Sequence, residues 1–138
     1  MDEQWTRSVV EQAPGLHNSI PRTYSSVVRV GPLVFVAGQC GIDENARVVD
    51  DEFAPQARQA LWRVESALTS IGAEIRHITN MTTYLTDPDL ADEFLSIRRT
   101  WYEPAFGGRE YPPSTTLAVK ALLVPHALIE VQVQAVVH

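Results

Sequence analysis

The chain has 138 residues, of which 45% are hydrophobic and 20% are charged, and this is enough for one domain with a single core. Its formal net charge of −6 argues against binding to nucleic acid or to an anionic membrane surface, because both need a clustered basic face. One cysteine excludes an internal disulfide, and the four histidines lack metal-ligand spacing. No signal peptide and no apolar run of about 20 residues is visible, so we expect a cytoplasmic protein of one domain, over residues 1–138, without a metal site.

The N-terminal third predicts a hairpin that follows an irregular segment. A proline and a glycine interrupt residues 1–20, which are therefore expected to be irregular. Runs rich in β-branched residues at 27–30 and 33–36 flank a Gly-Pro pair, a pattern typical of two strands joined by a turn. A further short strand is expected at residues 48–49.

Two helices are predicted, each with one apolar stripe. The first begins near Asp51, and Gly72 is placed to end it. Its apolar residues recur at spacings of three and four: Phe53, Ala57, Ala60, Leu61, Val64, Ala67, Leu68 and Ile71. The second begins at the acidic, proline-containing stretch 87–89 and ends at the glycine pair 107–108. Its stripe consists of Leu90, Phe94, Ile97 and Trp101.

Three more strands complete the pattern, at residues 78–85, 115–122 and 128–136. In the last strand an apolar set of residues alternates with a set that carries carboxylate and amide groups. The apolar set is Ile129, Val131, Val133 and Ala135, and the other set is Glu130, Gln132, Gln134 and Val136. The apolar set should lie under the helices, which predicts an α+β fold with a single mixed sheet and both helices on one face. The other face has no second layer of helices, so we expect a neighbouring copy to cover it.

Three segments, taken in chain order, resemble one known family. "VGPLVFVAGQCGID" is similar to the family's hairpin, and "QARQALWRVESALTSIGAEIRHITNMTTYLTD" to its first helix and the strand that follows. "IEVQVQAVV" is similar to its last strand. Over roughly residues 21–137 the chain therefore resembles the Rid family, the reactive intermediate deaminases that are also called YjgF-like proteins.

The resemblance implies a chorismate-mutase-like fold and a homotrimer with sites in the clefts between subunits. It also implies hydrolysis of enamines and imines to a keto acid and ammonia, without a metal or cofactor. In this family an arginine holds the substrate carboxylate and a glutamate positions the attacking water. The partners expected from the resemblance are copies of the chain itself and a small-molecule substrate or ligand.

Two candidate catalytic residues follow from the resemblance. Glu130 falls on the family glutamate, and a carboxylate in an apolar strand is costly unless it is paired or used. We expect it to act as a general base or to position water, the alternative being a structural hydrogen bond at a subunit boundary. Tyr24 matches the family tyrosine and could donate its hydroxyl to the substrate, or it could simply pack at the start of a strand.

Candidate substrate-binding residues lie near the hairpin and at the start of the second helix. Gly31 matches the hairpin glycine of the family, and Gly38 and Gln39 match the Gly-Gln pair that follows it. Asp89 aligns with an asparagine that is common in the family. Cys40 could be a pocket nucleophile, but isolated cysteines are more often buried and inert.

The chain departs from the family pattern at Ser114. Family deaminases have Pro-Ala-Arg where this chain has "PPS", and a serine cannot supply the two parallel charged hydrogen bonds of a guanidinium. Loss of one charged hydrogen bond costs about 1.5–3 kcal/mol, or roughly ten- to a hundredfold in binding. Arg109 is the best replacement candidate and Arg22 the second, although exposed surface arginines are the commoner case.

Two functions of different classes remain open at this point. The first is a Rid-like, cofactor-free hydrolase of an enamine, an imine or a related reactive molecule, which would not be a standard 2-aminoacrylate deaminase. The second is a non-catalytic trimer that binds a small ligand or has a regulatory role, for which the replaced arginine is the main support.

Overall fold

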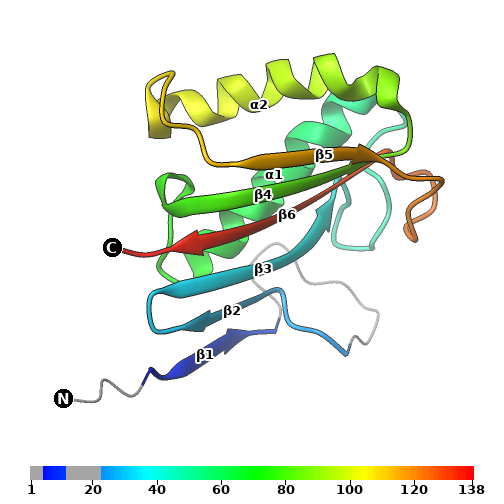
Figure 1. Cartoon of the computed structure of the whole chain (residues 1–138). Helices are drawn as coiled ribbons and strands as arrows, with labels where there is room; N and C mark the ends of the chain where they lie inside the picture. The colour runs from blue at the N-terminus through cyan, green and yellow to red at the C-terminus, as the bar shows by residue number, and fades with distance from the viewer. Residues whose placement is uncertain (1–4, 12–22) are drawn as a thin grey trace.

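A mixed six-stranded sheet runs through the computed structural model, which describes residues 5–11 and 23–138 (Figure 1). Its strands are β1 (Arg7–Val10), β2 (Val27–Val30), β3 (Leu33–Cys40), β4 (Ile78–Leu85), β5 (Ser114–Ala118) and β6 (Ile129–Val136). Their spatial order is β1-β2-β3-β6-β4-β5. Neighbouring strands are antiparallel except β4 and β5, which are parallel. Parallel strands need a long crossover connection, and a helix supplies it here.

Two α-helices cover one face of this sheet, as the sequence predicted. The helices are α1 (Phe53–Ser70) and α2 (Ala91–Phe106), and short 3-10 turns precede β4 and α2 at η1 (Ile75–His77) and η2 (Pro88–Leu90). Helix α1 packs on β3 and β6, and α2 lies beside it (Figure 1). The Tyr102 hydroxyl of α2 donates to the Met81 sulfur of β4 at 3.6 Å, which ties the second helix to the same face. Within the described residues, no helix is both long and apolar enough to cross a membrane.

The predicted alternation in β6 is confirmed and it defines the core. Its four apolar residues, Ile129, Val131, Val133 and Ala135, are at most 2% exposed. They lie in the same cluster as the buried stripe of α1, which includes Leu61, Val64 and Leu68. The other set of β6 residues therefore faces away from the helices, and we call that side of the sheet the open face.

The predicted helix ends are also confirmed. Gly72 follows α1 with φ of +80° and donates its N–H to the Thr69 carbonyl oxygen. Gly107 caps α2 with φ of +59°. Glycine suits both positions, because other residues adopt this left-handed backbone conformation only at a cost.

Three predictions about strands differ from the structure. Residues Arg7–Val10, expected to be irregular, form β1 because they pair with β2 along one edge of the sheet. Residues 48–49 form no strand, and Val48 makes only an isolated bridge to Ile42. The strand predicted for 115–122 ends at Ala118, whose partner Leu85 is the last residue of β4. In each case the partner strand decides the outcome, and a local pattern does not contain that information.

Candidate functional site

A row of cross-strand neighbours lies at one end of the open face. Cys40 of β3 is opposite Glu130 of β6, Glu130 is opposite Tyr84 of β4, and Tyr84 is opposite Leu117 of β5. Residues directly opposite one another point to the same side of a sheet, so these four side chains share the open face. Glu130 and Tyr84 are half-buried, while Leu117 is 38% exposed. The candidate catalytic carboxylate of Glu130 therefore lies in the middle of a row that contains both polar and apolar side chains.

A β-bulge in β3 brings a glycine next to this carboxylate. The register between β3 and β6 shifts between Val36 and Gln39, and Gly38 falls within that irregularity. A Cβ atom at position 38 would lie 2.9 Å from Glu130 Cδ. No other residue could leave the Glu130 side chain where it is, because real Cβ atoms do not approach that closely. The predicted site residues Gly38 and Glu130 are thus in contact, and bulges of this kind often occur beside functional sites.

The Cys40 thiol is the hydrogen-bond partner of Glu130. Its Sγ donates to Glu130 Oε1 at 3.5 Å. Burial, followed by the nearby Glu130 charge, raises the pKa of Cys40 to about 12. The thiol therefore keeps its proton at neutral pH, and a protonated thiol is a poor nucleophile. These contacts favour the inert, buried interpretation of Cys40 over the nucleophilic one.

Gln39 points the other way, toward the helices. It is 3% exposed, its Oε1 accepts a hydrogen bond from Arg63 Nε of α1 at 3.1 Å, and its own amide donates to the Ala37 carbonyl oxygen. Both ends of the side-chain amide are therefore engaged beneath α1. In the single chain this predicted substrate-binding residue supports the bulge from the opposite side of the sheet.

Tyr24 and Gly31 lie at different ends of the β2–β3 hairpin. Tyr24 is 57% exposed just before β2, and the nearby Ser26 carbonyl oxygen accepts the Ala37 N–H at 2.9 Å, which brings this segment close to the bulge. Gly31 forms the turn with φ of +57°, and a Cβ there would lie 2.6 Å from Trp5 Cγ. At about 3.3 Å per residue, the length of β3 and of the turn before it places Gly31 roughly 25 Å from the Glu130 row.

Ser114 contacts an arginine that the sequence analysis did not select. Ser114 Oγ lies 2.6 Å from Arg98 Nη1, so the guanidinium of α2 donates to the serine at the start of β5. Ser114 is opposite the buried Met81 and therefore faces the helices, whereas Glu130 faces the open side. One signal in the sequence could have pointed to Arg98: it is four residues from both Phe94 and Tyr102, on the buried side of α2.

The remaining two candidates, Asp89 and Arg109, are both exposed. Asp89 lies in η2, where its N–H donates to the Asp87 carboxylate at 2.8 Å. Arg109 lies in the turn after α2, and its N–H donates to the Phe106 carbonyl oxygen. In the described part of the chain Ser114 is bonded to Arg98 rather than to Arg109. Arg22 lies outside the described residues.

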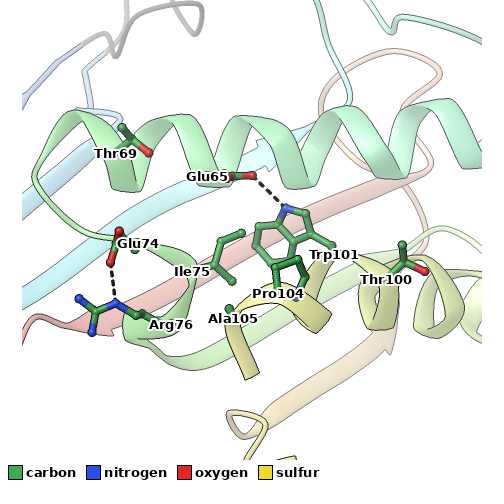
Figure 2. A pocket seen from close by; sticks show the side chains of 9 residues that line it. All are labelled: Glu65, Thr69, Glu74, Ile75, Arg76, Thr100, Trp101, Pro104 and Ala105. Carbon is green, nitrogen blue, oxygen red and sulfur yellow. Dashed lines mark hydrogen bonds and ion pairs between the residues drawn. The ribbon is translucent and has the colours of Figure 1, made fainter. Parts of the chain in front are cut away.

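A cavity of about 590 Å³ lies on the helix side of the sheet, between α1, η1 and α2 (Figure 2). Figure 2 shows two pairs among its polar side chains: Trp101 Nε1 donates to Glu65 Oε2 at 3.3 Å, and Arg76 binds Glu74 at 2.6 Å. None of the candidate catalytic or substrate-binding residues predicted from the sequence lines it. Elsewhere too, residues 5–11 and 23–138 contain no group of three His, Cys, Asp or Glu side chains that could hold a metal ion.

Comparison with known proteins gives consistent matches over most of the chain. The family model described as Endoribonuclease L-PSP matches residues 17–137. A RutC family protein of Aquifex aeolicus is 30% identical over 114 residues, which cover 82% of this chain and 87% of the relative. The crystal structure of Rv2704 from Mycobacterium tuberculosis, a member of the YjgF/YER057c/UK114 family, is 31% identical with a TM-score of 0.76, covering 96% of this chain and 100% of that one. The structure of Escherichia coli TdcF with bound serine has a TM-score of 0.83 at 20% identity, covering 95% of this chain and 100% of that one.

Proposed function

The chain belongs to the YjgF/Rid family, whose model is described as Endoribonuclease L-PSP, and on this basis we propose that it hydrolyses an enamine or imine at Glu130 without a cofactor. Membership supports a small-molecule deaminase, hydrolase or binding role in general. The observation that carries the more specific proposal is the half-buried Glu130 carboxylate, held between the Gly38 backbone and the Cys40 thiol.

The contacts of Glu130 leave it able to act on water. Among the described residues Oε1 accepts from the Cys40 thiol, which leaves Oε2 to accept a proton from a water molecule. That water attacks the carbon of the C=N bond while Glu130 takes one of its protons and passes it to the nitrogen, which gives a neutral carbinolamine. Glu130 then takes the carbinolamine hydroxyl proton and delivers it to the nitrogen, so that the C–N bond breaks, the C=O bond forms and ammonia leaves. The products are a carbonyl compound and ammonia, so the sequence of steps consumes only water. In this proposal the Tyr24 hydroxyl donates a hydrogen bond to the substrate.

The proposal includes a homotrimer in which a second copy completes the crevice. Phe35 is 44% exposed and Leu117 38% exposed, and register places both on the open face. A neighbouring sheet packed on this face would bury both side chains and would enclose Glu130. Ser114 would then belong to the site only as a contribution from an adjoining copy, because within one chain it faces the helices whereas Glu130 faces the open side. Asp89 stays a proposed substrate-binding residue.

The substrate that fits this proposal is not a small 2-imino acid. Ser114 stands where a carboxylate-binding arginine is expected from the resemblance, and its hydroxyl is occupied by Arg98. We therefore expect a neutral or larger imine. The nuclease activity named in the family description is not part of the proposal, because a chain with a net charge of −6 is poorly suited to bind RNA.

A non-catalytic ligand-binding trimer is the alternative function. The replaced arginine favours it, and the related TdcF structure contains a bound serine. A protein of this class would bind a small ligand at the open face without turnover.

The experiment that separates the two functions measures ammonia release. Purified protein is incubated with a panel of enzymatically generated imines, including 2-aminoacrylate and larger or neutral analogues. We expect acceleration with a larger or neutral imine, little with 2-aminoacrylate, and a loss of about 100-fold or more in kcat for Glu130→Gln. The matched control Glu65→Gln, on the helix side, should keep full activity. Full activity in Glu130→Gln would contradict the mechanism, and rates equal to buffer for every imine would favour the ligand-binding alternative.

A further inference from the structure

A small pocket of about 150 Å³ lies beside the entry to β5, away from the proposed catalytic row. Its lining residues are Leu95, Arg98, Arg99, Tyr102, Tyr111 and Pro112. Ser114, which is bonded to Arg98, is three positions before Leu117 on β5 and points to the opposite side of the sheet. At about 3.3 Å per residue, Ser114 is roughly 10 Å along the strand from the Glu130 row. The mechanism proposed above uses none of the lining residues.

The pocket carries positive charge that no side chain of residues 5–11 or 23–138 neutralises. Arg98 is half-buried and Arg99 is exposed, and neither has an ion-pair partner among the described residues. The Arg98 guanidinium lies 5.3 Å from the centre of the Phe94 ring and 5.6 Å from that of Tyr102. A guanidinium held partly out of water without a carboxylate partner is costly, so an anion is the natural complement of this pocket.

The contact with Ser114 orients Arg98. Its Nη1 donates to Ser114 Oγ at 2.6 Å and lies 3.7 Å from the Met81 sulfur. These contacts anchor one nitrogen of the planar group and leave its other N–H donors for a ligand. A guanidinium fixed in this way can offer two parallel hydrogen bonds to a carboxylate.

The size and the remaining lining residues limit the class of anion. A volume of 150 Å³ corresponds to about five water molecules, which suits a ligand of roughly five or six heavy atoms. Tyr102 and Tyr111 are stacked at 5.7 Å, and Leu95 and Pro112 complete an apolar wall. An alkyl tail can pack on this wall, whereas inorganic phosphate would leave it without a partner.

We propose that this pocket binds a small monocarboxylate with a short alkyl tail, its carboxylate on Arg98 and Arg99 and its tail against Tyr111. The site is independent of Glu130, so it can exist whether or not the protein hydrolyses imines. Such a pocket lets the chain bind an anion although its own net charge is −6.

Titration of the full-length protein with butyrate tests the proposal, with calorimetry for affinity and NMR of the ¹⁵N-labelled arginine Nε–H groups for location. We expect saturable binding that shifts the Arg98 signal, no binding of butyramide, and weaker binding of phosphate than of butyrate. Arg98→Gln should weaken butyrate binding at least tenfold. The matched control Arg47→Gln, an exposed arginine outside the pocket, should bind butyrate as the parent protein does.

Three outcomes would overturn the proposal. They are butyrate shifts confined to signals other than Arg98 and Arg99, equal binding of butyramide, and phosphate binding tighter than butyrate. If Arg98→Gln does not fold, the comparison of butyrate with butyramide on the parent protein, located by the Arg98 signal, still decides the matter.

Discussion

Glu130 and Cys40 form a coupled pair in which each side chain changes the chemistry of the other. The carboxylate raises the pKa of the thiol, and burial does so to a larger extent. The thiol in turn occupies one carboxylate oxygen with a weak hydrogen bond. A weak donor of this kind holds the carboxylate in position without neutralising it, which suits a residue that must accept a proton.

The pH dependence of Cys40 alkylation tests this pairing. In the parent protein we expect little reaction with iodoacetamide at neutral pH and an increase only toward pH 12, where the folded thiol ionises. Glu130→Gln removes a negative charge that raises the pKa, so the midpoint of the alkylation profile should move to lower pH. Protein unfolded in guanidinium chloride is the control and should react with a midpoint near the ordinary value of 9.0. Coincident profiles for the two folded proteins would contradict the pairing.

The raised pKa of Cys40 also affects the folding stability of the protein in alkaline solution. Above pH 9.0 the unfolded chain releases the Cys40 proton while the folded chain retains it, so the free energy of unfolding falls as pH rises from 9.0 toward 12. Below pH 9.0 both states keep the proton, and Cys40 adds no slope there.

At the level of elements, two glycines near the end of β3 allow different close approaches. At Gly38 the neighbour is the flexible end of the Glu130 side chain, and at Gly41 it is the backbone of α1 at Gln56. A side-chain end can move aside, but a helix backbone cannot move without disturbing its packing on β3. A glycine at position 38 is therefore needed for the placement of the Glu130 side chain, and a glycine at position 41 for the packing of α1 on β3.

Alanine substitution of each glycine tests this difference. Gly41→Ala should reduce the free energy of unfolding by about 1–3 kcal/mol or more, because the added methyl group collides with the backbone of α1. Gly38→Ala should cost much less stability but should displace the Glu130 carboxylate and lower any imine hydrolysis. Urea denaturation provides the first measurement and the ammonia assay the second. Equal loss of stability in the two variants would show that Gly38 is also a structural requirement.

At the level of the whole molecule, the two faces of the sheet differ in burial. The helices bury one face, while the open face keeps an apolar residue exposed on β3 and another on β5. Exposed apolar side chains on a sheet face are typical of an interface between copies of a chain. The proposed trimer would remove them from water and would deepen the row around Glu130 into a cleft.

Light scattering after size-exclusion chromatography tests the assembly. We expect the parent protein to have the mass of a trimer and Phe35→Glu to have that of a monomer, because a buried charge on the open face would be unpaired. Trp62→Glu is the matched control: Trp62 is an equally exposed aromatic residue at 47%, but it lies on α1 and should leave the mass unchanged. A monomeric parent protein would remove the proposed intersubunit cleft.

Most of the fold could be predicted from local patterns because its elements carry strong periodicity. The apolar stripes of α1 and α2 and the alternation in β6 each report which side of an element is buried. The glycines after the helices mark their ends through a backbone preference that belongs to the residue itself. Strand β1 carries no comparable signal, since four residues become a strand only when another strand pairs with them.

The candidate site was only partly predictable, for the same reason. Sequence alone selected Glu130 and placed it on the face opposite the helices, because alternation along one strand is a local property. Only the tertiary structure decided that Cys40 and Gly38 contact that carboxylate, that Gln39 turns toward α1, and that Arg98 reaches Ser114. These contacts depend on register, on a bulge and on the position of α2 over the sheet, which arise when distant segments pack together.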